Sequence, residues 1–174
     1  NTGLKHVTSG NPDVSYRDLL YVKKRFINKD SLREAISDIA NAIFKIRSTK
    51  IWGKATTSCA SDSKKFGAWD QNLMTEWHNR YRGRGIMIYW HVEKNSVCIH
   101  SQVKRCSSTE VAAMIEGVIR HCTDMEVQKN YVDTHGQSIV AFAFSHILGF
   151  QLLPRLKSIH SQKLYLPNNE LKDT

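Results

Sequence analysis

The sequence predicts an α/β domain built on a mixed sheet, in which an antiparallel meander is followed by parallel strands. Three observations predict it. The apolar spacing changes from a helical to an alternating period near residue 55. Two strand-like runs, 84–92 and 97–103, are separated by a four-residue turn, which is typical of a hairpin. After residue 106, helix-like and strand-like segments alternate, and such crossovers make neighbouring strands parallel.

The first 54 residues are predicted to form a helical segment ahead of the main domain. A polar stretch over 1–12 leads into a helix expected over 14–27. A second helix is expected from Ser31, which makes a capping-box pattern with Glu34, to about Ser48. Apolar side chains follow at helical spacing: Leu32, Ile36, Ile39, Ile43 and Ile46. This stripe predicts that the helix packs against another part of the protein.

The main domain is expected over 55–167 and opens with a short strand over 56–61. A long polar and basic stretch follows from 64 to 83. The hairpin strands 84–92 and 97–103 come next. Together these three strands predict an antiparallel meander.

The second half of the main domain alternates helix and strand. Ser107 and Glu110 make a second capping-box pattern, so a helix is expected from there to Cys122. Ser138 and Gly149 are expected to start and end a later helix, which is apolar nearly all round and should therefore be buried. The remaining elements are strands over 127–132 and 150–153, followed by a frayed end over 168–174.

This order of elements is that of a ribonuclease H-like fold. In that fold the opening strand and the strand over 127–132 are neighbours, about 4.8 Å apart. Asp62 follows the first of these strands and Asp133 follows the second. The two carboxylates are therefore expected side by side at the carboxyl edge of the sheet.

Paired carboxylates at a strand edge suit Mg²⁺, which takes oxygen ligands. Two such ions, roughly 3.5–4 Å apart, can activate an attacking oxygen and stabilise a leaving one in phosphodiester chemistry. Each residue also has an ordinary interpretation, since Asp62 can cap a turn and Asp133 can cap the helix at Ser138. Their joint placement favours a metal site.

Charge points to a polyanionic partner without requiring one. The chain has 174 residues, 41% of them hydrophobic, and a net charge of +9. Residues 1–54 hold 11 Lys and Arg against 5 Asp and Glu, residues 55–105 hold 8 against 4, and residues 106–174 hold 6 against 7. A basic surface attracts the phosphate backbone of nucleic acids, although many domains are basic for no such reason.

Several basic and aromatic residues near the aspartates are candidates for nucleic-acid contacts. His135 can reach a phosphate or a metal-bound water, or be an ordinary turn residue. The candidate phosphate contacts are Lys64, Lys65, Arg80, Arg82 and Arg84, each also compatible with a solvated surface. The aromatic residues Trp69, Trp77 and Tyr81 can stack on bases or pack in the fold.

The cysteines indicate a reduced cytoplasmic protein. Cys59, Cys98, Cys106 and Cys122 lack Cys-x-x-Cys spacing, and three of them lie in patterns typical of buried positions. A zinc site from His91, Cys98, His100 and Cys106 matches no common module. The sequence also has no run of about 20 apolar residues and no signal peptide, so no membrane role is expected.

The motifs themselves resemble those of the Tn3 family of replicative transposases. The sequence SDSKKFG, which contains Asp62, resembles the first acidic motif of that family, and YVDTHG resembles the block around its second catalytic aspartate, Asp133. The other matching blocks lie at 82–85, 89–92, 146–150 and 153–155. The resemblance runs in order from about residue 50 to 166, and residues 1–50 resemble the helices that precede this domain.

The resemblance implies an Asp-Asp-Glu transposase of ribonuclease H-like fold. Such enzymes use Mg²⁺ or Mn²⁺, with two ions in the complete site, to cut DNA at transposon ends and join the 3′-hydroxyl to target DNA. Asp62 and Asp133 would be the first two metal ligands. The expected partners are transposon-end and target DNA, with self-association of the full-length protein. The expected location is the bacterial cytoplasm, with action at the nucleoid.

The third acid is the point of departure from the family. There it is a Glu on a later helix, and this chain, which we interpret as a fragment, stops before that helix. Glu170 is rejected as a substitute because it follows 167–169, a Pro-Asn-Asn end with no helix to hold it. The isolated chain is therefore expected to bind metal weakly and to be inactive.

Two alternatives stay open. One is another ribonuclease H-like enzyme, an integrase or a nuclease, which an ordered Glu170 beside Asp62 and Asp133 would favour. The other is a non-catalytic DNA-binding or assembly module that uses the basic first half of the chain.

Overall fold

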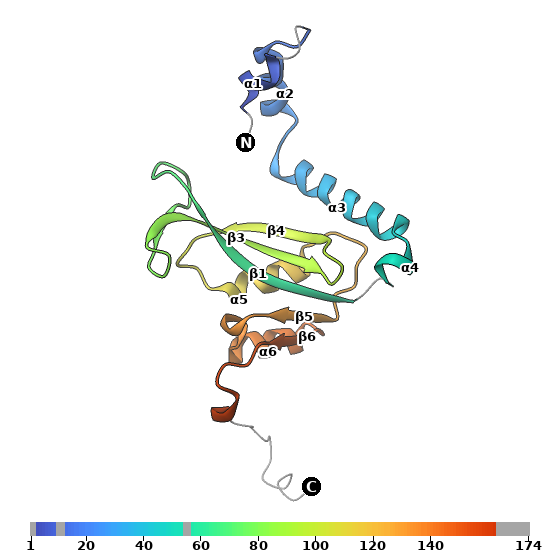
Figure 1. Ribbon diagram of the computed structural model, residues 1–174, viewed down its shortest axis with the longest axis vertical. Helices are drawn as coiled ribbons and strands as arrows, with labels where there is room; N and C mark the ends of the chain where they lie inside the picture. Colours follow the sequence, from blue (N-terminus) through green and yellow to red (C-terminus); the bar gives the residue numbers. More distant parts are fainter. Residues whose placement is uncertain (1–2, 10–12, 54–56, 163–174) are drawn as a thin grey trace, which may run out of the picture.

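A computed structural model of the chain describes residues 3–9, 13–53 and 57–162. The sheet lies in the middle of the molecule, with the N-terminal helices at one end and the C-terminal segment at the other (Figure 1). Among the helices of these residues, none combines the length and the apolar content that crossing a membrane requires.

The sheet confirms the predicted ribonuclease H-like order. Its main strands are β1 (Ser58–Gly67), β3 (Gly83–Glu93), β4 (Cys98–Lys104), β5 (Lys129–Val132) and β6 (Gln151–Pro154). They lie in the order β4-β3-β1-β5-β6, and a short strand that we did not predict, β2 (Glu76–His78), pairs with the start of β3. The pairs β1/β3 and β3/β4 are antiparallel, whereas β1/β5 and β5/β6 are parallel.

The opening strand is longer than predicted. We expected it to end at residue 61, but β1 continues to Gly67 because β3 pairs with it over its whole polar half, as far as Gly67↔Gly85. Asp62 is therefore inside a strand and not at its end. The parallel pairing with β5 does stop there, at Ser61↔Val132. Asp62 and Asp133 thus occupy the next register position on neighbouring strands.

Both predicted capping boxes were misplaced. The helix α3 (Lys29–Ile46) starts at Asn28, whose side chain accepts from the backbone N–H groups of Asp30 and Ser31. The helix α5 (Glu110–Ile119) starts at Thr109. Asparagine and threonine are as suitable for the N-cap position as serine or nearly so. Asn28 and Thr109 occupy it here, and not Ser31 and Ser107.

The flanking helices mostly follow the predicted pattern. The helix α2 (Tyr16–Arg25) begins at a Ser15 capping box within the predicted span. The short elements are α1 (Leu4–Thr8), α4 (Thr49–Trp52), η1 (Thr134–Gly136) and η2 (Ile159–Ser161). In α5 the prediction ran too far, because the helix ends before Cys122, which is exposed with a left-handed backbone (φ 57°). Cys59 is buried, while Cys98 and Cys106 are half-buried.

The helix α6 (Ile139–Ile147) is capped by Ser138 as predicted, and Gly149 follows it at φ 80°. The prediction that this helix is buried all round is wrong. Ala141 and Ser145 are buried, but Ile139 and Ile147 remain 83% and 77% exposed. Only the row facing the sheet is covered by the described residues.

One core holds α5 and α6 against the same side of the sheet. Its buried members come from β3, α5, β5, α6 and β6: Tyr89, Ala113, Met114, Val132, Ala141, Phe150 and Leu152. Gly117 lets α5 approach β3 closely, since a Cβ there would lie 1.9 Å from Cε1 of His91. His91 is fully buried, and its Nε2 donates to the Met114 carbonyl at 3.0 Å. The structure thus gives this histidine a packing partner in α5.

The N-terminal segment is fastened to the sheet through α3. Arg47, just after α3, makes a buried ion pair with Glu93 at the end of β3, at 3.0 Å. Ser37 of α3 donates a hydrogen bond to the Cys122 carbonyl. The predicted apolar stripe of α3 is otherwise largely uncovered by the described residues, with Ile39 61% exposed.

Candidate active site

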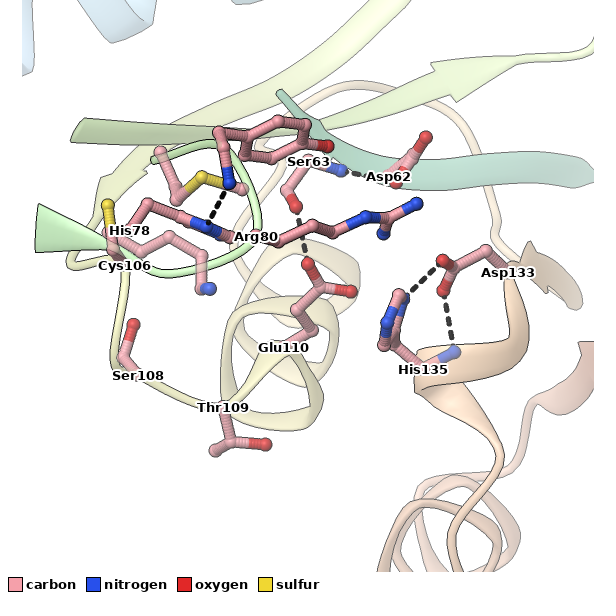
Figure 2. Close-up of a pocket in the computed structure, with 13 residues that line it drawn as sticks. Asp62, Ser63, His78, Arg80, Cys106, Ser108, Thr109, Glu110, Asp133 and His135 are labelled. Carbon is pink, nitrogen blue, oxygen red and sulfur yellow. Dashed lines mark hydrogen bonds and ion pairs between the residues drawn. The ribbon is translucent and has the colours of Figure 1, made fainter. Parts of the chain in front are cut away.

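A pocket of about 510 Å³ lies beside the middle of β1, the carboxyl end of β5 and the start of α5. Both predicted aspartates line it, together with His135 and Arg80 (Figure 2). Lys64, Lys65, Arg82 and Arg84 are not among the residues that line it. The structure therefore gathers part of the predicted set and leaves the other basic residues outside.

Asp133 sits on a tightly folded turn. Its Oδ1 accepts from the His135 backbone N–H at 2.8 Å, and its Oδ2 lies 2.5 Å from His135 Nδ1. Gly136 makes this turn possible, because a Cβ there would lie 2.3 Å from a methyl carbon of Val132. Asp133 thus caps η1 and not the helix that begins after Ser138, and its closest partner is His135.

Glu110 is an acid of this pocket that the sequence analysis treated only as a cap. It is the first residue of α5, and Ser63 of β1 donates a hydrogen bond to its Oε1. One ligand atom each of Glu110, Asp133 and His135 lie within 4.8 Å of one another. These three residues form the metal-compatible cluster of the described chain, and two of them offer the oxygen donors that hard divalent cations take.

Asp62 stands apart from this cluster. Side chains alternate along a strand, so Ser61 and Ser63 face the helices while Asp62 faces the opposite side and is exposed. Its Oδ1 accepts from the Ser63 backbone N–H at 2.6 Å. Figure 2 shows its carboxylate above those of Asp133 and Glu110. The two aspartates follow the last residues paired between β1 and β5, Ser61 and Val132, whereas Asp62 is not part of the compact cluster.

A buried network below the carboxylates joins three strands. The Tyr89 hydroxyl donates to Ser61 Oγ at 3.2 Å, and Ser61 donates to Asn130 Oδ1 at 3.0 Å. Burial raises the pKa of Tyr89 well above its ordinary value, and the negative charges of Glu110, Asp62 and Asp133 add to the rise. Tyr89 therefore stays protonated as a donor and helps to hold β1 against β5 beneath the acids.

Positive side chains line the other side of the pocket. Figure 2 shows the Arg80 guanidinium extending toward the carboxylates, and it stacks over the Tyr81 ring at 5.6 Å. Arg84 pairs instead with Asp70 at 3.2 Å. Lys104, at the end of β4, also lines the pocket and was not predicted.

The zinc site considered from His91, Cys98, His100 and Cys106, whose spacing matches no common module, is not a metal-compatible cluster of the described residues. His91 and His100 have ring centroids 5.9 Å apart, but among the described residues only Glu110, Asp133 and His135 bring three possible metal ligands together. Burial lowers the pKa of His91 to about 4 and also lowers that of His100. These histidines are neutral packing residues near the core.

Comparison with known proteins assigns the family. The sequence model of the Tn3 transposase DDE domain matches residues 1–172. The chain belongs to this family. The match confirms the resemblance expected from the motifs around Asp62 and Asp133. The mixed sheet of this Tn3-family domain has the ribonuclease H-like strand order.

Relatives of this Tn3-family domain are much longer proteins. The transposase for transposon Tn1546 from Enterococcus faecium is 25% identical over 95% of this chain and 17% of its own length. The transposase for transposon Tn501 from Pseudomonas aeruginosa is 26% identical over 96% of this chain and 17% of its own length. Among solved structures, a piggyBac transposase synaptic complex with hairpin DNA has a TM-score of 0.42 at 15% identity, covering 75% of this chain and 30% of that one. The chain spans 17% of the length of these two curated relatives.

Proposed function

We propose that the protein acts in DNA transposition, as part of a DDE catalytic domain that cuts DNA at transposon ends and joins the ends to target DNA. The observation that carries the proposal is that Asp62 and Asp133 follow the last residues paired between the parallel strands β1 and β5 and line one pocket of a Tn3-family domain. Transposon-end DNA, target DNA and further copies of the full-length protein are the proposed partners. The proposed setting is the bacterial cytoplasm at the nucleoid.

The proposed cofactor is a pair of divalent cations, Mg²⁺ or Mn²⁺. The donors fit it, since Asp133 and Glu110 present carboxylate oxygens within 4.8 Å of each other. Asp62 would enter the site from the neighbouring strand. When bound, the cations supply Lewis-acid activation of the attacking and leaving oxygens in phosphodiester displacement.

The residues of the chain position these ligands. His135 orients the Asp133 carboxylate through two contacts, and Ser63 orients Glu110. Arg80 faces the carboxylates and is proposed to hold a backbone phosphate of the DNA. Lys64, Lys65, Arg82 and Arg84 are proposed as contacts to DNA beyond the pocket.

The domain boundaries are also a proposal, with a helical segment over 1–54 and a catalytic core over 55–167. The buried Arg47–Glu93 pair supports treating the two as docked. Glu170, the rejected third acid, lies outside the described residues. We propose that the third acid comes from another part of the full-length protein, and that this chain alone binds metal weakly and does not transfer strands.

The test uses the full-length protein with Asp62→Asn or Asp133→Asn. We expect loss of end cleavage and strand transfer by several orders of magnitude, while binding to transposon-end DNA is retained. Unchanged transfer would refute the catalytic assignment and favour a DNA-binding or assembly module. Hydrolysis of DNA without any joining to target would favour the nuclease alternative.

A further inference from the structure

Lys104 is a largely buried lysine that faces the pocket and has no partner among the described residues. Only 7% of its surface is exposed, and it is one of the residues that line the pocket. No ion pair or hydrogen bond of its ammonium group occurs among residues 3–9, 13–53 and 57–162. Lysines with so little exposed surface are almost always paired. The ammonium of Lys104 is not among the fully buried atoms that lack a partner, so it reaches the open pocket, where it is available to an anion from outside the fold.

The strand register explains why Lys104 lies in the pocket. Met87 of β3 pairs with Lys65 of β1 on one side and with Lys104 of β4 on the other. These three residues form one row across the sheet, on the face that carries Tyr89. The helix α5 covers the row that contains Tyr89, where Gln102 donates to the Ala113 carbonyl. Because α5 begins only at Glu110, it does not cover the neighbouring row of Lys65, Met87 and Lys104. Met87 and Lys104 of this row therefore line the open floor of the pocket, and Lys65 continues the same row just beyond the lining residues.

The charges of Lys65 and Lys104 both influence Cys106. Burial raises the pKa of the Cys106 thiol and the charge of Glu76 adds to the rise, whereas the charges of Lys65 and Lys104 oppose it. Both ammonium groups thus lie near Cys106, which lines the pocket. Two cations flanking a buried methionine repel each other in the free protein, and a bound anion would relieve that repulsion.

We propose that Lys104, with Lys65 beside it, binds a phosphate group of a DNA strand on the floor of the pocket. The proposal rests on the proposed function, because it places a DNA phosphate next to the acids Glu110 and Asp133 in the same pocket. Lysine is a compact charge that suits a phosphate oxygen. A purely structural lysine would be expected to have a carboxylate or carbonyl partner at this depth.

The experiment replaces Lys104 with methionine in the full-length protein and measures binding of a single-stranded DNA oligonucleotide over a range of salt concentrations. Lys104→Met keeps the length of the side chain and removes its charge. We expect affinity to fall about tenfold or more, the usual loss for a charged hydrogen bond. The slope of log affinity against log salt should decrease by about one. The melting temperature should stay equal or rise, because an unpaired buried charge is removed.

Lys129→Met is the matched control, since Lys129 is exposed at the opposite end of β5 from Asp133. It should leave affinity and salt slope unchanged. Lys104→Arg, which restores the charge, should recover most of the binding even if the methionine variant folds less well. Unchanged DNA affinity and salt slope in Lys104→Met would overturn the proposal. A loss of affinity in both Lys104 variants that is accompanied by a lower melting temperature would also overturn it, because Lys104 would then have a structural role.

Inorganic phosphate, used alone in the same proteins, separates the two sources of the anion. If Lys104→Met loses only phosphate binding and keeps DNA binding, the floor is a small-anion site and the DNA proposal is wrong. DNA binding by Lys104→Met and strand transfer by Asp62→Asn test different claims, so either result can fail without the other. Loss of strand transfer in that variant, with normal DNA binding by Lys104→Met, would leave the proposed function standing and remove only this inference.

Discussion

The two faces of β1 use polar side chains in opposite ways. On the helix-covered face, Ser61 and Ser63 are tied to Asn130 and Glu110, and each is at least half-buried. On the other face, Asp62 and Lys64 are exposed, and the next residue of that row, Phe66, meets Trp90 at a ring distance of 5.8 Å. The polar side chains of the covered face therefore hold β1 against β5 and α5 and position the acids of the pocket, whereas those of the other face are exposed among the described residues.

The largest effect should come from Gly117→Ala, on the covered face. A Cβ at residue 117 would lie 1.9 Å from His91 Cε1, so α5 must move away from β3. We expect a net loss of about 3 kcal/mol or more in the free energy of unfolding, because this overpacking outweighs the gain of about 1 kcal/mol in helix propensity. Urea denaturation followed by circular dichroism measures it.

Gly67→Ala is the matched control at the far end of β1. Nothing lies within 4 Å of a Cβ built there, so its free energy of unfolding should stay within about 0.5 kcal/mol of the parent. If Gly117→Ala and Gly67→Ala lose the same free energy of unfolding, the close contact between α5 and β3 is not the cause of the loss.

The next effect is a pH dependence that arises from the covered face. Burial lowers the pKa of His91 from 6.5 to about 4, and burial lowers the pKa values of His100 and His121 as well. The native state favours the neutral imidazole of His91. Its contribution to the free energy of unfolding is therefore fully present above pH 6.5 and is lost as the pH falls toward 4. The difference corresponds to about 3 kcal/mol for His91.

The measurement is the free energy of unfolding between pH 7.5 and 4, an interval set by those pKa values. His91→Gln, which cannot titrate but can donate to the Met114 carbonyl, should flatten most of the slope. A slope that is the same in parent and variant would place the responsible group elsewhere.

The sequence was enough for the strand order, because hairpin and crossover signals limit the topology strongly. It was not enough for Glu110 and Lys104, since their importance arises from which elements meet at one edge. In this topology β4 runs parallel to β1, so its last residue and the start of α5 reach the same edge as Asp133. The predicted order of elements already implied that the end of β4 and the start of α5 lie at this edge. We did not use it, because we interpreted Glu110 only as part of a helix cap. The misplaced caps and the exposed face of α6 depend on local competition and on tertiary contacts, which a periodic pattern does not contain.

The smallest effect tests whether the covered face also supplies a metal ligand, using Mn²⁺ as the probe. Glu110→Gln keeps an oxygen that can accept from Ser63 but removes the carboxylate charge. We expect about 10- to 100-fold weaker Mn²⁺ binding, measured by electron paramagnetic resonance, with unchanged melting temperature. Ser63→Ala separates ligation from positioning, because it leaves the carboxylate in place without its anchor. If Glu110 is a ligand, Glu110→Gln must lose more affinity than Ser63→Ala. If the two variants lose the same amount, Glu110 acts only by fixing β1 against α5, and Asp62 and Asp133 hold the ion without it.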